Sequence, residues 1–246
     1  MHDAINNPLN PIFHGVDFLL SHLSKPEFPR TIATKVTEGK QFVVSEKIEA
    51  LAYYKLANYM DCRLAAYPYS SDKAPQVIDF VMLDLDLNNF RFSRQKLDKA
   101  LHKILSELKN KHDIVPTVIW SGNGYHVLLP LESLQTTLED MAEFTRFKDP
   151  SKHILRFLEK YISNKKSDFV HNNTVSFGNC MLRVPGSINT KNGKNHIVSI
   201  MHKWNGKRFD IEPLLGDFHA YLIDHYNNNQ KNKYRNTTYG NLLSRP

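Results

Sequence analysis

Two aspartates at the end of an apolar run are the residues best suited to chemistry in this chain. In the stretch QVIDFVMLDLDLN, residues 76–88, Asp84 and Asp86 follow a series of β-branched and large apolar side chains. Residues two apart on a strand point to the same side, so both carboxylates share a face and Asp79 points to the other. Neighbouring carboxylates repel each other unless a cation lies between them, and Mg²⁺ or Mn²⁺ suits such a pair. The competing interpretation is a strand that ends in a solvated acidic turn.

A glycine turn forms the second candidate site. The segment TVIWSGNGYHVLL, residues 117–129, contains two apolar strands that meet at Ser121, Gly122 and Gly124, with His126 just inside the second strand. Glycine permits positive φ and lets a ligand approach the backbone. Successive N–H groups in such a turn form an anion-binding concavity, and a histidine there can donate to a phosphate. An ordinary hairpin with a histidine satisfied in the core has the same pattern.

A basic turn forms the third candidate site. The segment MLRVPGSINTKNGK, residues 181–194, places Arg183 at the end of an apolar strand, just before a Pro-Gly turn, and Lys191 after it. A planar guanidinium with a nearby ammonium suits phosphate recognition. A basic turn taken alone is more often a solvated loop.

The elements that must position these motifs mix helices and strands without a regular βαβ period. Hydrophobic spacing predicts helices at residues 10–23, 46–60, 93–110, 134–147, 151–162 and 213–225. Strands are predicted at residues 31–36, 41–44, 62–67, 76–88, 115–120, 125–129, 181–184, 196–204 and 208–211. Glu38-Gly39 and Asn205-Gly206 predict hairpins between their flanking strands. The pattern predicts an α+β fold with a largely antiparallel sheet flanked by helices.

Composition limits the domain organisation and the partners. The chain has 246 residues and a net charge of +7, which favours an anionic partner such as nucleic acid over a merely basic soluble protein. We expect an N-terminal αβ unit at 1–75, a core at 76–226 and a basic tail or linker at 227–246. Two distant cysteines predict a reducing compartment. The absence of a signal pattern or a long apolar run predicts a soluble cytoplasmic protein without a membrane partner.

The three motifs together resemble a known family. DLDLN, SGNGYH and RVPGSINTK, in this order and within residues 76–207, resemble the archaeo-eukaryotic primase superfamily. The similarity is closest to the primase-polymerases of archaeal plasmids, viruses and mobile elements. The resemblance implies a modified RRM-like sheet that carries the active site beside an N-terminal αβ unit. It also implies a DNA primase or primase-polymerase that transfers nucleotides from ribo- or deoxynucleoside triphosphates along single-stranded DNA. A primer strand and a helicase or accessory domain are the other implied partners.

The resemblance also implies a metal centre. Asp84 and Asp86 would hold the catalytic Mg²⁺ or Mn²⁺ ions, and the family adds a third carboxylate from a later strand. The match is poor at that point, because residues 169–195 contain no Asp or Glu. Asp168 is the best candidate for the third ligand, and Asp210 is the fallback.

The nucleotide contacts are carried over from the same resemblance. His126 would contact the phosphates of the incoming nucleotide, with Ser121, Gly122 and Gly124 beside it. Arg183 and Lys191 would contact the triphosphate or the template.

Two other functions remain open at this point. One is a catalytically weak nucleic-acid-binding member of the same fold, which is favoured if no third carboxylate reaches the pair. The other is a metal-dependent nuclease, which also needs clustered carboxylates and a basic groove. A nuclease needs no nucleotide pocket, so the glycine turn and the basic turn argue against it.

Overall fold

The computed structural model describes residues 11–69, 79–132, 153, 156–158, 161, 180–224 and 226. The chain divides into two compact units, Met1–Phe209 and Asp210–Pro246. All three motifs belong to the first unit. The helix predicted at 134–147, the candidate ligand Asp168 and the tail at 227–246 lie outside the described residues.

One sheet of the first unit is built mainly from the N-terminal residues. Its strands are antiparallel and follow the order β2-β1-β3-β7. They comprise β1 (Arg30–Ala33), β2 (Phe42–Val44), β3 (Arg63–Pro68) and β7 (Met181–Arg183). The pairing of β1 with β2 confirms the hairpin predicted around Glu38-Gly39. Because β7 carries Arg183, the third motif completes the sheet of the N-terminal region.

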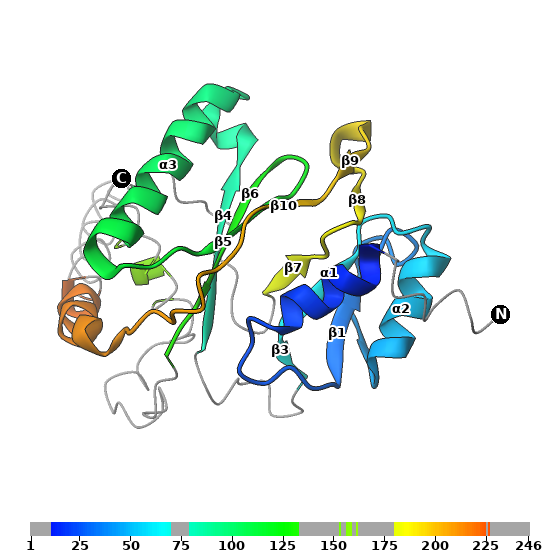
Figure 1. The fold of residues 1–246 in the computed structure, drawn as a ribbon, viewed down its shortest axis with the longest axis horizontal. Coiled ribbons are helices and arrows are strands. Elements are labelled where there is room, and N and C mark those ends of the chain that lie inside the picture. Colours follow the sequence, from blue (N-terminus) through cyan, green and yellow to red (C-terminus); the bar gives the residue numbers. More distant parts are fainter. Residues whose placement is uncertain are drawn as a thin grey trace, which may run out of the picture. The chain divides into compact units, whose positions relative to one another are not determined.

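Two helices accompany this sheet, α1 (Pro11–Leu20) and α2 (Lys47–Leu56) (Figure 1). In α1, Gly15 lets the chain approach the Pro-Gly turn after β7 very closely. A Cβ at Gly15 would lie 2.0 Å from the Pro185 carbonyl oxygen, so any larger residue would force α1 and this turn apart. The turn that follows Arg183 is therefore held from behind by α1.

The second sheet carries the first two motifs. Its strands are also antiparallel and follow the order β10-β5-β6-β4. They comprise β4 (Phe80–Asp86), β5 (Thr117–Trp120), β6 (Gly124–Pro130) and β10 (Ser199–His202). Residues Phe80–Leu83 and Leu85 are buried, whereas Asp84 and Asp86 are half-buried. This alternation confirms that the two aspartates share a face of the strand.

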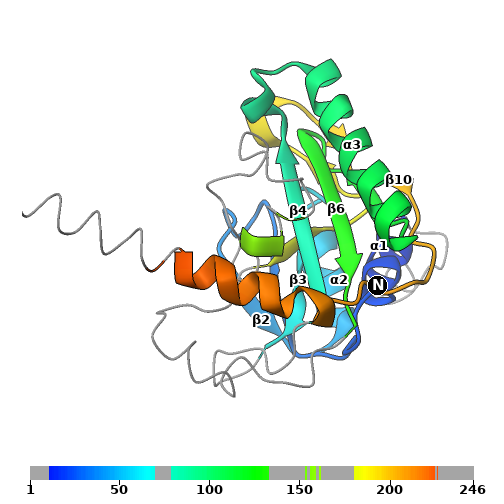
Figure 2. The same cartoon turned by 90° about the vertical axis from the view of Figure 1, so that its left-hand side faces the viewer.

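The helix α3 (Arg94–His112) lies along one face of this second sheet (Figures 1 and 2). Ser93 caps its first turn by accepting a hydrogen bond from the Lys96 N–H group, and Asp113 ends it in a left-handed conformation. Its buried stripe consists of Leu97, Ala100, Leu101, Ile104 and Leu108. The helix therefore covers the face opposite the two aspartates.

The hairpin predicted through Asn205-Gly206 is wrong. The strand before this turn, β10, pairs with β5, and Phe209 forms a parallel bridge with Leu131 instead of returning along β10. The edge of β5 supplies a long-range partner for β10, and Phe209 is buried at 1% exposure, so tertiary packing overrides the local turn signal.

The remaining described elements are short. They are the 3₁₀ turns η1 (Leu87–Phe90), η5 (Lys191–Gly193) and η6 (Glu212–Leu214), the two-stranded sheet β8 (Ile188–Asn189) with β9 (His196–Ile197), and helical residues 215–224. The observed architecture confirms the predicted α+β class with mostly antiparallel sheets and flanking helices. In the part of the chain that the structure describes, no helix combines the length and apolar character needed to cross a bilayer.

Candidate active site

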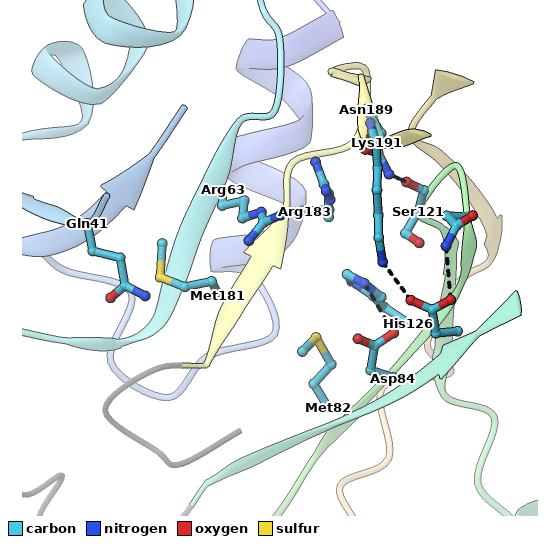
Figure 3. A pocket seen from close by; sticks show the side chains of 12 residues that line it. Gln41, Arg63, Met82, Asp84, Ser121, His126, Met181, Arg183, Asn189 and Lys191 are labelled. Carbon is cyan, nitrogen blue, oxygen red and sulfur yellow. Dashed lines mark hydrogen bonds and ion pairs between the residues drawn. The ribbon is translucent and has the colours of Figure 1, made fainter. Parts of the chain in front are cut away.

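The three motifs line one cavity of about 260 Å³. Its walls come from β4 and β6 of the second sheet, β3 and β7 of the first sheet, and the turns at 121–123 and 189–191 (Figure 3). The predicted site residues that line it are Asp84, Asp86, Ser121, His126, Arg183 and Lys191. Residues as far apart in sequence as Arg63 and Lys191 thus meet at one cavity.

Strand register brings the first two motifs together. In the β4–β6 pair Asp84 lies opposite His126, and Asp86 lies opposite Gly124. The close approach needs glycine, because a Cβ at Gly124 would lie 2.1 Å from the Leu85 carbonyl oxygen. Gly122 has φ of +92° and its added Cβ would meet His196 and Asn189. Neither glycine lines the cavity, so the structure gives both a packing role.

The Asp86 carboxylate is held by several donors. Its Oδ1 accepts from the Asn88 backbone N–H and from Asn123 Nδ2, both at 2.9 Å. Its Oδ2 accepts from Lys191 Nζ at 2.7 Å, a contact that joins the first and third motifs. Asp84 is less constrained, and its Oδ1 lies 3.7 Å from His126 Nε2, which is too long for a hydrogen bond.

A buried asparagine fixes the segment that carries Lys191. Asn189 is 2% exposed, and its Nδ2 donates to the Ser121 carbonyl at 2.5 Å while its Oδ1 accepts from the Lys191 N–H at 2.9 Å. The glycine turn and the basic turn are therefore tied to each other through one amide side chain. Asn189 is part of the third motif in the sequence, but the sequence does not indicate its hydrogen bonds to Ser121 and Lys191.

The surroundings of the His126 imidazole lower its pKa and so favour the neutral ring. Burial is the largest cause that lowers the pKa of His126, and the positive charges of Arg183 and Arg63 add to it against the opposing carboxylate of Asp84. Its Nδ1 is buried without a hydrogen-bond partner. Buried polar atoms are almost always paired, so the position of this ring is not explained by internal hydrogen bonding.

Arg63 and Arg183 form a pair of cations on one wall. They are cross-strand neighbours in the β3–β7 ladder, and Figure 3 shows both side chains at the cavity. Burial is the main cause that lowers the pKa of Arg63, and the charge of Arg183 lowers it further. Arg183 is buried and Arg63 is half-buried. Two adjacent guanidinium groups are stabilised by an anion, and a phosphate fits their planar donor geometry. The sequence analysis missed Arg63. An arginine at the start of an apolar strand usually marks the solvent-exposed end of that strand, so its type and position did not indicate a binding site.

Asp61 is a second residue that the sequence analysis missed. Its Oδ1 accepts from Arg183 Nη1 at 2.8 Å and from the Thr190 N–H at 3.1 Å, and its Oδ2 accepts from Thr190 Oγ1 at 2.5 Å. Burial alone would raise the pKa of the Asp61 carboxyl, but the hydrogen bonds from Thr190 and Arg183 outweigh it and lower that pKa. One carboxylate therefore orients Arg183 and anchors the residue before Lys191. No motif marks Asp61, so only the fold could have found it.

The carboxylate pair fits a divalent ion that is shared with a phosphate ligand. Mg²⁺ is usually bound by one or two carboxylates together with waters and substrate phosphates. Asp84 and Asp86 would therefore provide enough ligands from the protein. Within the described residues no group of three or more His, Cys, Asp or Glu side chains forms a metal site. The third ligand candidate Asp168 lies outside these residues, and the fallback Asp210 belongs to the second unit, where its Oδ1 accepts from the Glu212 N–H at 2.9 Å.

Comparison of the chain with models of protein families and with curated proteins finds no match. The cavity combines two carboxylates on one strand, two adjacent guanidinium groups, a lysine and a histidine whose pKa is lowered by burial. Such a set suits a ligand that carries several negative charges and binds a divalent ion.

Proposed function

We propose that this protein is a primase-polymerase of the archaeo-eukaryotic primase type, with a modified RRM-like catalytic sheet. The observation that carries the proposal is the convergence of DLDLN, SGNGYH and RVPGSINTK on one cavity. The reaction would be template-directed transfer of a nucleotide from a nucleoside triphosphate to a 3′-hydroxyl group, with release of pyrophosphate.

The cationic wall would bind the triphosphate. Arg63 and Arg183 present two planar donors side by side, and a triphosphate brings about four negative charges to offset their mutual repulsion. The neutral His126 ring would donate one hydrogen bond to a phosphate oxygen without adding charge. These groups would hold the α-phosphate close to the carboxylate side of the cavity.

The carboxylate side would hold the metal. A divalent ion bound by Asp84 and Asp86 supplies charge stabilisation for the attacking and leaving oxygens of the phosphoryl transfer. Lys191 Nζ occupies Asp86 Oδ2 in the free protein and would transfer to a phosphate oxygen when the nucleotide binds. The hydrogen bonds from Asn88 and Asn123 keep the Asp86 carboxylate in one orientation throughout.

A binding protein without catalysis is the second candidate. The specific observation in its favour is the Lys191–Asp86 ion pair, which places an ammonium group where a metal would otherwise contact Asp86. Such a protein would bind nucleotides or nucleic acid and form no phosphodiester bond. A metal-dependent nuclease is a weaker alternative, because it gives no role to the paired guanidinium groups of Arg63 and Arg183.

Primer extension tests the proposal and separates the three functions. The protein is incubated with Mg²⁺ or Mn²⁺, a labelled primer on a template, and one nucleoside triphosphate at a time. We expect the primer to grow only with the nucleotide complementary to the template. Nucleotide binding without growth would support the binding protein, and shortening of the labelled strand without added nucleotide would support the nuclease.

A further inference from the structure

An exposed aromatic side chain follows the strand that carries the two aspartates. Phe92 is 70% exposed, more than any other large apolar side chain in the part of the chain that the structure describes. The preceding aromatic, Phe90, is buried at 4% and anchors the segment to the core. Phe92 is therefore not part of the core, and most of its ring is open to a partner.

The segment that carries Phe92 is held in one conformation. Arg91 and Phe92 have φ of 52° and 59°, a region that side chains other than glycine rarely adopt. Three backbone hydrogen bonds enforce it, from Arg91 to Asn88, from Phe92 to Leu87 and from Ser93 to Phe90. A fixed backbone leaves only the two side-chain torsions of Phe92 to be ordered on binding. An aromatic presented in this way is suited to contact with a partner.

The same segment is linked directly to the carboxylates. Leu87 follows Asp86, and its N–H donates to the Asn123 carbonyl at 2.9 Å, while Asn123 Nδ2 donates to Asp86 Oδ1. The Phe92 N–H in turn donates to the Leu87 carbonyl at 3.1 Å. Phe92 thus lies between η1 and α3, in the segment that connects the end of β4 to that helix. Figure 1 shows β4 and α3 as neighbouring elements.

The surroundings of Phe92 are basic. Arg91 is exposed beside it, and Lys96, Lys99 and Lys103 follow at the spacing that places them on one face of α3. Arg94 is neutralised by Asp98 and covers the Trp120 ring at 3.8 Å. Among the described residues no ion pair forms with Arg91, Lys96, Lys99 or Lys103. Their charges would therefore attract an anionic partner.

We propose that Phe92, with Arg91 beside it, is a stacking platform for one base of a single-stranded nucleic acid at the edge of the candidate active site. The exposed ring can stack on a base only if the face of that base is open, as in a single strand. The neighbouring cations without ion pairs can bind the phosphates of the same strand. A duplex hides its base faces, so it does not fit. The strand would run from Phe92 along the lysine face of α3. That this strand is the template rests on the proposed function.

Abasic DNA provides the sharpest test. Binding of the full chain to a fluorescent oligothymidine and to an abasic strand of the same length is measured without nucleotide or metal. Phe92→Ala should weaken binding of oligothymidine roughly 5- to 150-fold, the range that stacking of one base contributes. Binding of the abasic strand should not change. The salt dependence of affinity should also stay the same, because a stacking contact releases no counterions.

Matched variants separate stacking from charge and from folding. Phe92→Trp should retain the affinity, and Leu56→Ala, which removes an apolar side chain of 67% exposure from α2, should change nothing. Arg91→Gln should weaken the binding of both the oligothymidine and the abasic strand, and it should lower the slope of log affinity against log salt by about 0.7. Thermal unfolding of Phe92→Ala should match that of the wild type, since the side chain is exposed.

Three results would overturn the platform. The first is equal affinity of wild type and Phe92→Ala for oligothymidine. The second is a loss of affinity for the abasic strand, caused by Phe92→Ala, that equals the loss for oligothymidine. The third is tight binding of an acidic peptide that Phe92→Ala abolishes while DNA binding persists. Each can occur while primer extension still succeeds. Conversely, a protein that stacks oligothymidine on Phe92 and extends no primer would retain the platform and lose the proposed function.

Discussion

The Asp61→Ala variant should lose about 3 kcal/mol of folding stability. Removing one member of a buried ion pair leaves the other charge unpaired and costs about 3–5 kcal/mol. Arg183 keeps only 6% of its side chain exposed, while Asp61 keeps 19%, so water can replace part of the lost contact and the lower end of that range applies. The two hydrogen bonds from Thr190 are lost as well.

Chemical denaturation measures this loss. Urea unfolding of Asp61→Ala is compared with Asp61→Asn, which keeps an acceptor for the Thr190 N–H but loses the charge, and should therefore lose about half as much stability. Asp17→Ala is the matched control, because Asp17 accepts from Lys47 at 2.9 Å with side-chain exposures of 45% and 36%. An exposed pair of this kind contributes at most about 1 kcal/mol. If Asp61→Ala fell within about 0.5 kcal/mol of wild type, the buried network would have no energetic weight and the reasoning would fail.

The same network predicts a pH dependence. Burial would raise the pKa of the Asp61 carboxyl, but the hydrogen bonds from Thr190 and Arg183 lower it below its usual range in the folded protein. A lowered carboxyl pKa contributes stability that is fully present above the unfolded pKa and is lost as pH falls through the folded pKa. The stability difference between wild type and Asp61→Asn should be constant above about pH 5 and shrink below pH 4. A difference that grows in acid would contradict the direction of the pKa shift.

The remaining predictions concern the cavity. Asp84→Asn and Asp86→Asn should each lower primer extension by at least about 100-fold while Asp79→Asn, on the opposite face, is far milder; equal losses would remove the metal assignment. His126→Ala should weaken nucleoside triphosphate binding by about tenfold with little change for single-stranded DNA, as measured by separate titrations. Lys191→Met should strengthen Mn²⁺ binding to the free protein and weaken triphosphate binding, because the ammonium competes for Asp86 Oδ2 and attracts phosphate; changes of the same sign would refute that exchange.

The local parts of the fold could be predicted from the sequence. Strand parity placed Asp84 and Asp86 on one face, and hydrophobic spacing predicted the helix at 93–110 that the structure shows as α3, since both depend on neighbours in the chain. The failed prediction was the hairpin through Asn205-Gly206, where a partner strand about eighty residues away replaced the nearby one. Local patterns carry no information about such competition.

The supporting residues of the site could not be predicted for the same reason. Arg63 becomes a site residue only because β3 pairs with β7, and Asp61 only because the turn before β3 reaches Arg183 across 122 positions. Neither residue has a distinguishing neighbour pattern. The convergence of the motifs themselves was inferred from the family resemblance, and the described residues place six of the predicted side chains around one cavity.

Primer-free synthesis tests the central claim most directly. The wild-type protein is incubated with single-stranded template, Mg²⁺ or Mn²⁺ and either ribo- or deoxynucleoside triphosphates, and the newly made strands are separated by length, with Asp84→Asn in parallel. We expect the wild type to produce template-dependent oligonucleotides with at least one nucleotide set, and Asp84→Asn to produce none. Absence of product with every nucleotide set and both metals, from a folded protein that binds the template, would contradict the assignment as a primase-polymerase.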